Sequence, residues 1–232
     1  MMVAIILAGG KGTRLRSVVS GLPKPMAPIL GRPFLEYQMD YWINQGVSHF
    51  ILSVGYLGDA IINHFGDAYK GIAIKYAVEH DPLGTGGGLL LAAQDLTDPF
   101  LVLNGDTFID ADLDIISKFH LNRQSKWTLL LFRTSQYNRY MGVDINQNGE
   151  IVSLKSKVKK SYNLANGGVY LIDPSALKKT PYKIGDKVSL EDELLPEFVS
   201  NGGILFGIEC KGRFIDIGTP EDYYQSKNII HS

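Results

Sequence analysis

The sequence has little cysteine, no long apolar run and almost no net charge, and each absence excludes a class of protein. Cys210 is the only cysteine in 232 residues, so no disulfide can form within the chain, which is typical of the reducing cytoplasm where we expect this protein. No apolar stretch approaches the roughly 18 residues of a membrane-spanning helix, and no signal-peptide pattern is present, so we expect no membrane partner. The formal net charge of −1 argues against nucleic acid as a partner. Any anionic ligand would therefore be held by local charge.

Several familiar catalytic signatures are also missing. The five histidines show no metal-ligand spacing, and neither a G-x-S-x-G nor an H-E-x-x-H pattern occurs. In the glycine-rich stretch at residues 9–12, the third glycine of a dinucleotide-binding fingerprint is replaced by Leu15. A Walker A loop would need a glycine where Ile5 stands. This stretch is therefore neither a nicotinamide-binding turn nor a P-loop.

What the sequence does contain is a regular alternation of apolar runs and segments with helical period. This alternation predicts an α/β fold, with a sheet covered by helices on both faces. Strands are expected at residues 2–7, 50–54, 72–78, 100–103, 127–132, 143–145, 151–154, 168–172, 204–208 and 214–217. Helices are expected at residues 33–46, 56–65, 84–93, 112–123, 189–199 and from 220 onward. No linker or internal repeat divides the chain, so we expect a single domain over residues 1–232.

The most informative stretch is residues 7–15, L-A-G-G-K-G-T-R-L, which follows the first apolar run directly. Three glycines in four positions let the backbone approach a ligand closely and direct successive N–H groups at it. Lys11 and Arg14 add positive charge there, and an arginine can bind phosphate through two parallel hydrogen bonds. The stretch therefore predicts a phosphate-binding loop.

Together with P-K-P at residues 23–25, this loop resembles the signature of the sugar-1-phosphate nucleotidyltransferases, and the resemblance extends over essentially the whole chain. It implies a single-domain, Rossmann-like fold with a mixed, mostly parallel sheet and helices on both faces. In this family the N-terminal half binds the nucleotide and the C-terminal half completes the sugar-phosphate pocket. Within the family, the sequence is most similar to guanylyltransferases acting on D-glycero-D-manno-heptose 1-phosphate, and next to those acting on mannose 1-phosphate.

In this family an oxygen of the sugar phosphate attacks the α-phosphorus of a nucleoside triphosphate, and pyrophosphate leaves. The resemblance implies that Arg14 grips the triphosphate, that Lys24 stabilises charge at the α-phosphate, and that Asp106 and Asp216 bind Mg²⁺ or another divalent cation. From the residues alone, Asp106 follows a strand in an N-G-D sequence and reads equally well as a turn residue. Asp216, flanked by isoleucines, needs a partner or a metal.

The remaining site residues follow from the same resemblance. Nucleotide contacts are expected from the loop, from the segment around Glu79 and from the end of the fourth strand: Leu7, Ala8, Gly9, Gly10, Lys11, Gly12, Thr13, Glu79, Gly84, Thr85, Asn104 and Gly105. The sugar phosphate is expected at Gly142, Lys157, Asn166, Gly167 and Glu191. Glu79 is interpreted as the acceptor for the two donors of guanine, N1–H and the amino group, and reads equally well as a surface residue at a strand end. Lys155 stands where many relatives have a glutamate that binds sugar hydroxyls.

These features favour GTP as the nucleotide substrate and leave alternatives open. Within the same class, the alternatives are a mannose 1-phosphate guanylyltransferase and a uridylyltransferase acting on another sugar 1-phosphate. In a different class, the chain would be an inactive paralogue that binds a nucleotide sugar and regulates a partner. The presence of Arg14, Lys24, Asp106 and Asp216 favours activity. The sequence leaves both a monomer and a homodimer open.

Overall fold

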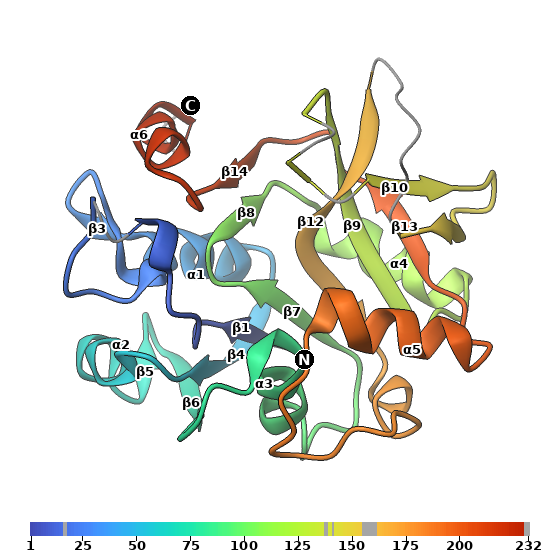
Figure 1. Cartoon of the computed structure of the whole chain (residues 1–232), viewed down its shortest axis with the longest axis horizontal. Helices are drawn as coiled ribbons and strands as arrows, with labels where there is room; N and C mark the ends of the chain where they lie inside the picture. Colours follow the sequence, from blue (N-terminus) through green and yellow to red (C-terminus); the bar gives the residue numbers. More distant parts are fainter. Residues whose placement is uncertain (16–17, 137–138, 141, 155–161, 230–232) are drawn as a thin grey trace.

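The computed structural model describes residues 1–15, 18–136, 139–140, 142–154 and 162–229, which form one α/β unit around a central sheet (Figure 1). The strands are β1 Met2–Leu7, β2 Pro28–Ile29, β3 Arg32–Pro33, β4 Val47–Val54, β5 Ala68–Tyr69, β6 Ile72–Val78, β7 Phe100–Asn104, β8 Thr107–Ile109, β9 Trp127–Thr134, β10 Gly142–Ile145, β11 Ile151–Ser153, β12 Asn163–Ile172, β13 Phe206–Glu209 and β14 Phe214–Asp216. The helices are α1 Phe34–Asn44, α2 Gly58–Phe65, α3 Gly84–Ala92, α4 Leu113–Asn122, α5 Leu195–Ser200 and α6 Pro220–Ile229.

The central sheet is mixed, as predicted. Its strands run in the order β11-β10-β12-β7-β1-β4-β6-β5, with β9 paired to β12 and β13 paired to β9. The four strands β7, β1, β4 and β6 are mutually parallel, and they come from the N-terminal half of the chain. Strand β12 then runs antiparallel to both β7 and β9. The parallel part therefore directs the carboxyl ends of four strands toward one edge, where α/β sheets bind their ligands.

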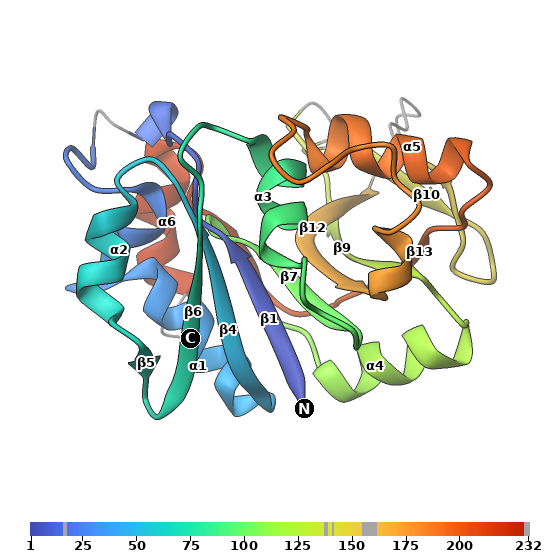
Figure 2. The same cartoon turned by 90° about the horizontal axis from the view of Figure 1, so that it is seen from below.

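Apolar side chains on both faces of the sheet explain why helices cover both sides. In β1, Ala4 and Ile6 join a core with α1, α2 and α4, whereas Ile5 joins a second core with α3 and α5. Figure 2 shows α4 and α5 on opposite sides of the sheet. Successive strand residues face opposite ways, so a strand buried on both faces is apolar at nearly every position, as β1 is. The prediction of helices on both faces is confirmed.

A third, smaller core fixes the C-terminal helix beside the glycine-rich loop. Leu15, immediately after that loop, packs with Ile217 and with Tyr223 of α6. The hydroxyl of Tyr223 donates a hydrogen bond to the carbonyl oxygen of Pro28. Strand β14 pairs with β8 rather than with the central sheet. This core brings the end of the chain to the loop near its start. None of the helices among the described residues has the length and apolarity that crossing a membrane requires.

Local departures from the predicted elements have physical causes. Helix α2 begins at Gly58 rather than at residue 56, because Leu57 adopts a left-handed conformation with φ 55°. The predicted helix at residues 189–199 opens with a π-helical turn, Leu190–Leu194. Ser189 caps this turn: its hydroxyl accepts the N–H of Asp192 at 3.1 Å, and its own backbone N–H donates to the Glu193 carboxylate at 2.8 Å.

Candidate active site

The candidate site lies where β1 ends, between its two parallel neighbours β4 and β7. After β1, the chain adds β4 and β6 to the sheet on one lateral side of β1, and it then adds β7 on the other. The end of β1 is therefore a topological switch point, where open α/β sheets bind their ligands. A cavity of about 600 Å³ opens there. It is lined by every residue predicted to contact the nucleotide and by Arg14, Lys24 and Asp106. Further lining residues, for which no site role was predicted, are Pro25, Pro82, Lys187 and Gly218.

Two glycines of this cavity are required by the backbone. Gly12 has a φ of +56°, and a Cβ atom there would lie 2.9 Å from the Cβ atom of Lys24. Gly105 donates its N–H to the carbonyl oxygen of Leu7 at 3.0 Å, and a Cβ atom at Gly105 would lie 2.7 Å from that same oxygen. The loop after β1 thus passes directly against Lys24, and the turn after β7 packs directly against β1. By contrast, a Cβ atom at Gly10 would meet no atom within 4 Å, so Gly10 lies in open space.

Lys24 and Asp106 form an ion pair in the cavity lining. Lys24 begins a short 3₁₀ turn, Lys24–Met26, in which prolines on both sides restrict the backbone. Its side chain is only 9% exposed, and its ammonium group bonds to a carboxylate oxygen of Asp106, which follows β7. The cavity therefore holds a directed positive charge and a directed carboxylate side by side.

The Glu79 side chain is fixed in the cavity wall. One carboxylate oxygen accepts a hydrogen bond from the Ser53 hydroxyl at 2.9 Å, and the other accepts from the backbone N–H of Leu83 at 3.0 Å. Cβ atoms at Gly9 and Gly88 would lie 2.5 and 2.8 Å from the first of these oxygens. The carboxylate thus occupies space that two glycines leave open. Each carboxylate oxygen has two acceptor positions, so both keep one for a ligand.

The glycines at the start of α3 make room for another segment of the chain. The carbonyl oxygen of Val188 accepts hydrogen bonds from the N–H groups of Gly86 and Gly87 at 2.9 and 3.1 Å. A Cβ atom at Gly87 would collide with the carbonyl oxygen of Asp186. Because this segment packs so closely on α3, the intervening Lys187 reaches the cavity. Sequence reasoning missed Lys187, since its local sequence is an ordinary polar loop and only this tertiary contact places it there.

A hydrogen-bond chain links three elements on the side where the sugar was predicted. Asn166 donates to the hydroxyl of Tyr170 at 2.7 Å, and that hydroxyl donates to Glu191 at 3.2 Å. Thr85 of α3 donates to the other carboxylate oxygen of Glu191 at 3.0 Å. Burial, and to a smaller extent the charge of Glu191, raises the pKa of Tyr170 well above its usual value. Tyr170 therefore stays a hydroxyl donor and holds Glu191 in place.

None of the predicted sugar-site residues that the structure describes lines this cavity itself, although Glu191 bonds to Thr85, which does. Gly142 opens β10 and pairs with Ala165 of β12. Gly167 lies in an irregular part of β12, and its carbonyl oxygen accepts a hydrogen bond from the Thr107 hydroxyl at 3.2 Å. Lys157 and Lys155 lie outside the described residues.

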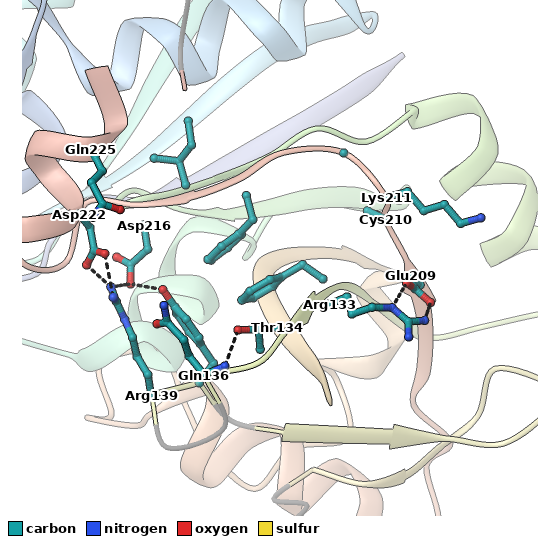
Figure 3. A pocket seen from close by; sticks show the side chains of 15 residues that line it. Arg133, Thr134, Gln136, Arg139, Glu209, Cys210, Lys211, Asp216, Asp222 and Gln225 are labelled. Atoms are coloured by element: carbon teal, nitrogen blue, oxygen red, sulfur yellow. Dashed lines mark hydrogen bonds and ion pairs between the residues drawn. The ribbon is translucent and has the colours of Figure 1, made fainter. Parts of the chain in front are cut away.

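The backbone brings Asp216 beside Asp106. Asp216 is the cross-strand partner of Thr107, and the next residue, Ile217, donates its N–H to the carbonyl oxygen of Asp106 at 3.0 Å. The Asp216 side chain lines a neighbouring cavity of about 680 Å³ (Figure 3). One of its oxygens accepts from the N–H of Gly218 at 2.6 Å, and Gly218 also lines the first cavity. Asp216 thus lies at the boundary between the two cavities.

These two carboxylates suit a divalent cation that substrates help to bind. Within the described ranges, no cluster of three or more His, Cys, Asp or Glu side chains is arranged to hold a metal. Asp106 and Asp216 are hard oxygen donors on adjoining strand ends, and each is held by a cation, Lys24 and Arg139 respectively. Mg²⁺ characteristically uses one or two carboxylates and takes its other ligands from phosphate oxygens and water. The residues present therefore fit such an ion.

Comparison with known proteins gives the family. The nucleotidyl transferase family model matches residues 3–232, and the chain belongs to this family. It is 41% identical over 225 residues to D-glycero-alpha-D-manno-heptose 1-phosphate guanylyltransferase of Campylobacter jejuni, covering 96% of this chain and 97% of that protein. The protein of the same name from Aneurinibacillus thermoaerophilus is 39% identical over 231 residues, with 99% and 98% covered. The crystal structure of HddC from Yersinia pseudotuberculosis complexed with GMP-PN superposes with a TM-score of 0.85 at 35% identity, covering 98% of this chain and 99% of that one. The predicted family and fold are confirmed.

Proposed function

We propose that this member of the nucleotidyl transferase family transfers the GMP group of GTP to D-glycero-α-D-manno-heptose 1-phosphate, giving the GDP-heptose and pyrophosphate. The observation that carries the proposal is the single cavity that combines the glycine loop, the Lys24–Asp106 pair and the fixed Glu79 carboxylate. The identities of about 40% to curated enzymes with this activity, over nearly the whole chain, support the same substrates.

The triphosphate is expected along the loop after β1. Backbone N–H groups of residues 9–13 and the charges of Lys11 and Arg14 lie on that side of the cavity. The Lys24 ammonium, directed by its 3₁₀ turn, is placed to stabilise the negative charge that develops at the α-phosphate during in-line attack. A divalent cation bound by Asp106 and Asp216 would supply charge neutralisation of the phosphates. Positioning and charge account for catalysis, with no protein acid or base required.

Two carboxylates that are held by hydrogen bonds are proposed to bind the two substrates, one the base of the nucleotide and the other the sugar. Glu79 lines the cavity and is held by Ser53 and Leu83, so a carboxylate that is already ordered is available to accept the two donors of guanine. Glu191 is held by Tyr170 and by Thr85, a residue of the cavity lining, and suits hydroxyl groups of the sugar. Lys157, outside the described residues, is proposed as a further phosphate contact. Nucleotide and sugar sites thereby come from the two halves of one domain, residues 1–232.

The test is pyrophosphate release with Mg²⁺, in which GTP, UTP, CTP, ATP and dTTP are each combined with heptose, mannose, glucose and N-acetylglucosamine 1-phosphates. We expect the highest kcat/KM for GTP with the heptose phosphate. A clear maximum at another pair would overturn the proposed substrates. Asp106→Asn should abolish most of the turnover while leaving the thermal unfolding temperature unchanged.

The inactive regulatory alternative makes a different prediction in the same assay. A regulatory paralogue would bind GTP or a GDP-sugar, as measured by calorimetry, and release no pyrophosphate with any pair. That combination would replace the proposed enzyme with a binding protein.

A further inference from the structure

A single arginine connects Asp216 to a third carboxylate. The guanidinium of Arg139 lies between Asp216 and Asp222 in the 680 Å³ cavity (Figure 3). It makes a forked ion pair with Asp222, in which one of the two contacts measures 2.7 Å, and a single contact of 3.1 Å with Asp216. The Arg139 side chain is 28% exposed and both carboxylates are 17% exposed, so the group remains partly accessible to water.

The two carboxylates hold Arg139 unequally. Asp222 lies in the first turn of α6 and accepts a further bond from the Thr219 hydroxyl, so its position is fixed. A forked arginine–carboxylate pair is stronger and more directional than a single contact. The contact with Asp216 is the weaker of the two, and it uses one of the oxygens proposed for the divalent cation. Asp222 can therefore keep Arg139 in place when Asp216 binds the divalent cation instead.

We propose that Arg139 is an internal counter-ion for Asp216: a divalent cation displaces it from Asp216, and Arg139, still held by Asp222, then donates the released N–H to the phosphate of the sugar substrate. This inference rests on the proposed function. No bond is made or broken in the exchange, and Arg139 keeps its charge throughout, because a guanidinium does not lose its proton in proteins.

The physical argument is charge balance. Lys24 and Arg139 are the two cations of this cluster and Asp106, Asp216 and Asp222 are its three carboxylates. A guanidinium and a divalent cation at the same carboxylate repel each other, so they compete for it. When the cation arrives with the two anionic substrates, the displaced arginine gains a phosphate partner in place of Asp216. The exchange thus replaces one ionic contact with another.

The first test measures Mn²⁺ binding without nucleotide by electron paramagnetic resonance, comparing wild type with Arg139→Gln. Removing the competing charge should tighten Mn²⁺ binding by about tenfold. Arg133→Gln is the matched control, because Arg133 lines the same cavity and makes a forked pair with Glu209, with both contacts at 2.9 Å. Figure 3 shows that pair on the far side of the cavity from Asp216. The control should change Mn²⁺ affinity by less than about twofold.

The second readout is kinetic. Arg139→Gln should raise KM for the sugar 1-phosphate by about tenfold while changing KM for GTP by less than about threefold. Tighter metal binding together with weaker sugar-phosphate binding is a pair of opposite effects that general loss of structure would not produce. Arg139→Lys, which keeps the charge, should retain wild-type Mn²⁺ affinity, and circular dichroism confirms folding of each variant.

Equal Mn²⁺ affinity in wild type and Arg139→Gln would overturn the counter-ion role. Asp216→Asn separates that result from failure of the proposed function. If Asp216→Asn weakens Mn²⁺ binding and Arg139→Gln leaves it unchanged, the metal site stands and the role of Arg139 falls. If Asp216→Asn has no effect either, the proposed metal site itself is wrong.

Discussion

Replacing Glu79 by glutamine is expected to remove the preference for guanine. The Leu83 N–H lies 3.0 Å from one carboxylate oxygen and can only donate, so the amide oxygen of the glutamine takes that position. The amide NH₂ then faces Ser53, whose hydroxyl can turn to accept a hydrogen bond. An oxygen that could accept a hydrogen bond from guanine is thereby replaced by an NH₂ group, which faces an N–H donor of the base.

The cost follows from the strength of hydrogen bonds to charged groups. Losing such a bond and leaving a donor unpaired costs about 3 kcal/mol, equivalent to about 150-fold in kcat/KM for GTP. The same NH₂ matches the N1 acceptor of adenine, so the preference for GTP over ATP should fall by at least that factor. The assay is pyrophosphate release with saturating sugar phosphate, with GTP and ATP titrated separately.

Ser53→Ala is the control for this substitution. It removes a hydroxyl that supports Glu79 at 2.9 Å and leaves both carboxylate oxygens in place. We expect a loss of about 1 kcal/mol for GTP, or about fivefold, with the order of nucleotides unchanged. An unchanged ratio of GTP to ATP in Glu79→Gln would refute the assignment of Glu79 as the guanine acceptor.

Three further predictions concern stability and catalysis. Burial lowers the pKa of His120, which is 3% exposed, to about 4, so between about pH 6.5 and 4 the unfolded chain binds one proton more than the folded chain. The contribution of His120 to the free energy of unfolding is therefore full above pH 6.5 and falls by about 2 kcal/mol on going to pH 5. In urea unfolding, His120→Gln should lose less stability than wild type over this range, and an identical pH profile would contradict this. Lys24→Ala should lower kcat at least 100-fold with a small change in the GTP dissociation constant, whereas a rise in KM alone would limit Lys24 to substrate binding. Gly87→Ala should destabilise the fold by about 1–3 kcal/mol, since its Cβ would collide with Asp186, whereas Gly10→Ala should leave the unfolding temperature unchanged and weaken GTP binding; equal unfolding temperatures for the two variants would argue against this packing.

Much of the fold could be predicted from the sequence because its strands are apolar at nearly every position. β1 and β6 were located at their observed bounds, since glycines or a change of periodicity end them. The left-handed Leu57 and the π turn before α5 were not predicted. Neither has a local signal, since a leucine does not mark a left-handed position and the helical pattern does not separate a π turn from an α-helical one.

The candidate site, too, could be predicted from the sequence only in part. The loop after β1 and the turn at Asp106 carry their own glycine and charge patterns, and the structure places both in one cavity. Lys187 and Arg139 have no such local pattern. Lys187 reaches the cavity only because its segment packs on α3, and Arg139 acts through Asp222, which lies 83 positions later in the chain. Such contacts between distant segments are determined by the fold, and they produce no residue pattern in the local sequence from which they could be predicted.

The central claim is that the cavity at the end of β1 is the nucleotide site. Hydrogen–deuterium exchange with a GTP analogue bearing a methylene bridge between the α- and β-phosphates, together with Mg²⁺, tests this without turnover. We predict protection of the segments 8–14, 79–85 and 104–106, which contribute the lining of this cavity. We predict unchanged exchange around Trp127 and in the segment 197–204, which contribute to the lining of a separate cavity of about 390 Å³. Protection confined to that second region, with residues 8–14 unaffected, would contradict the account.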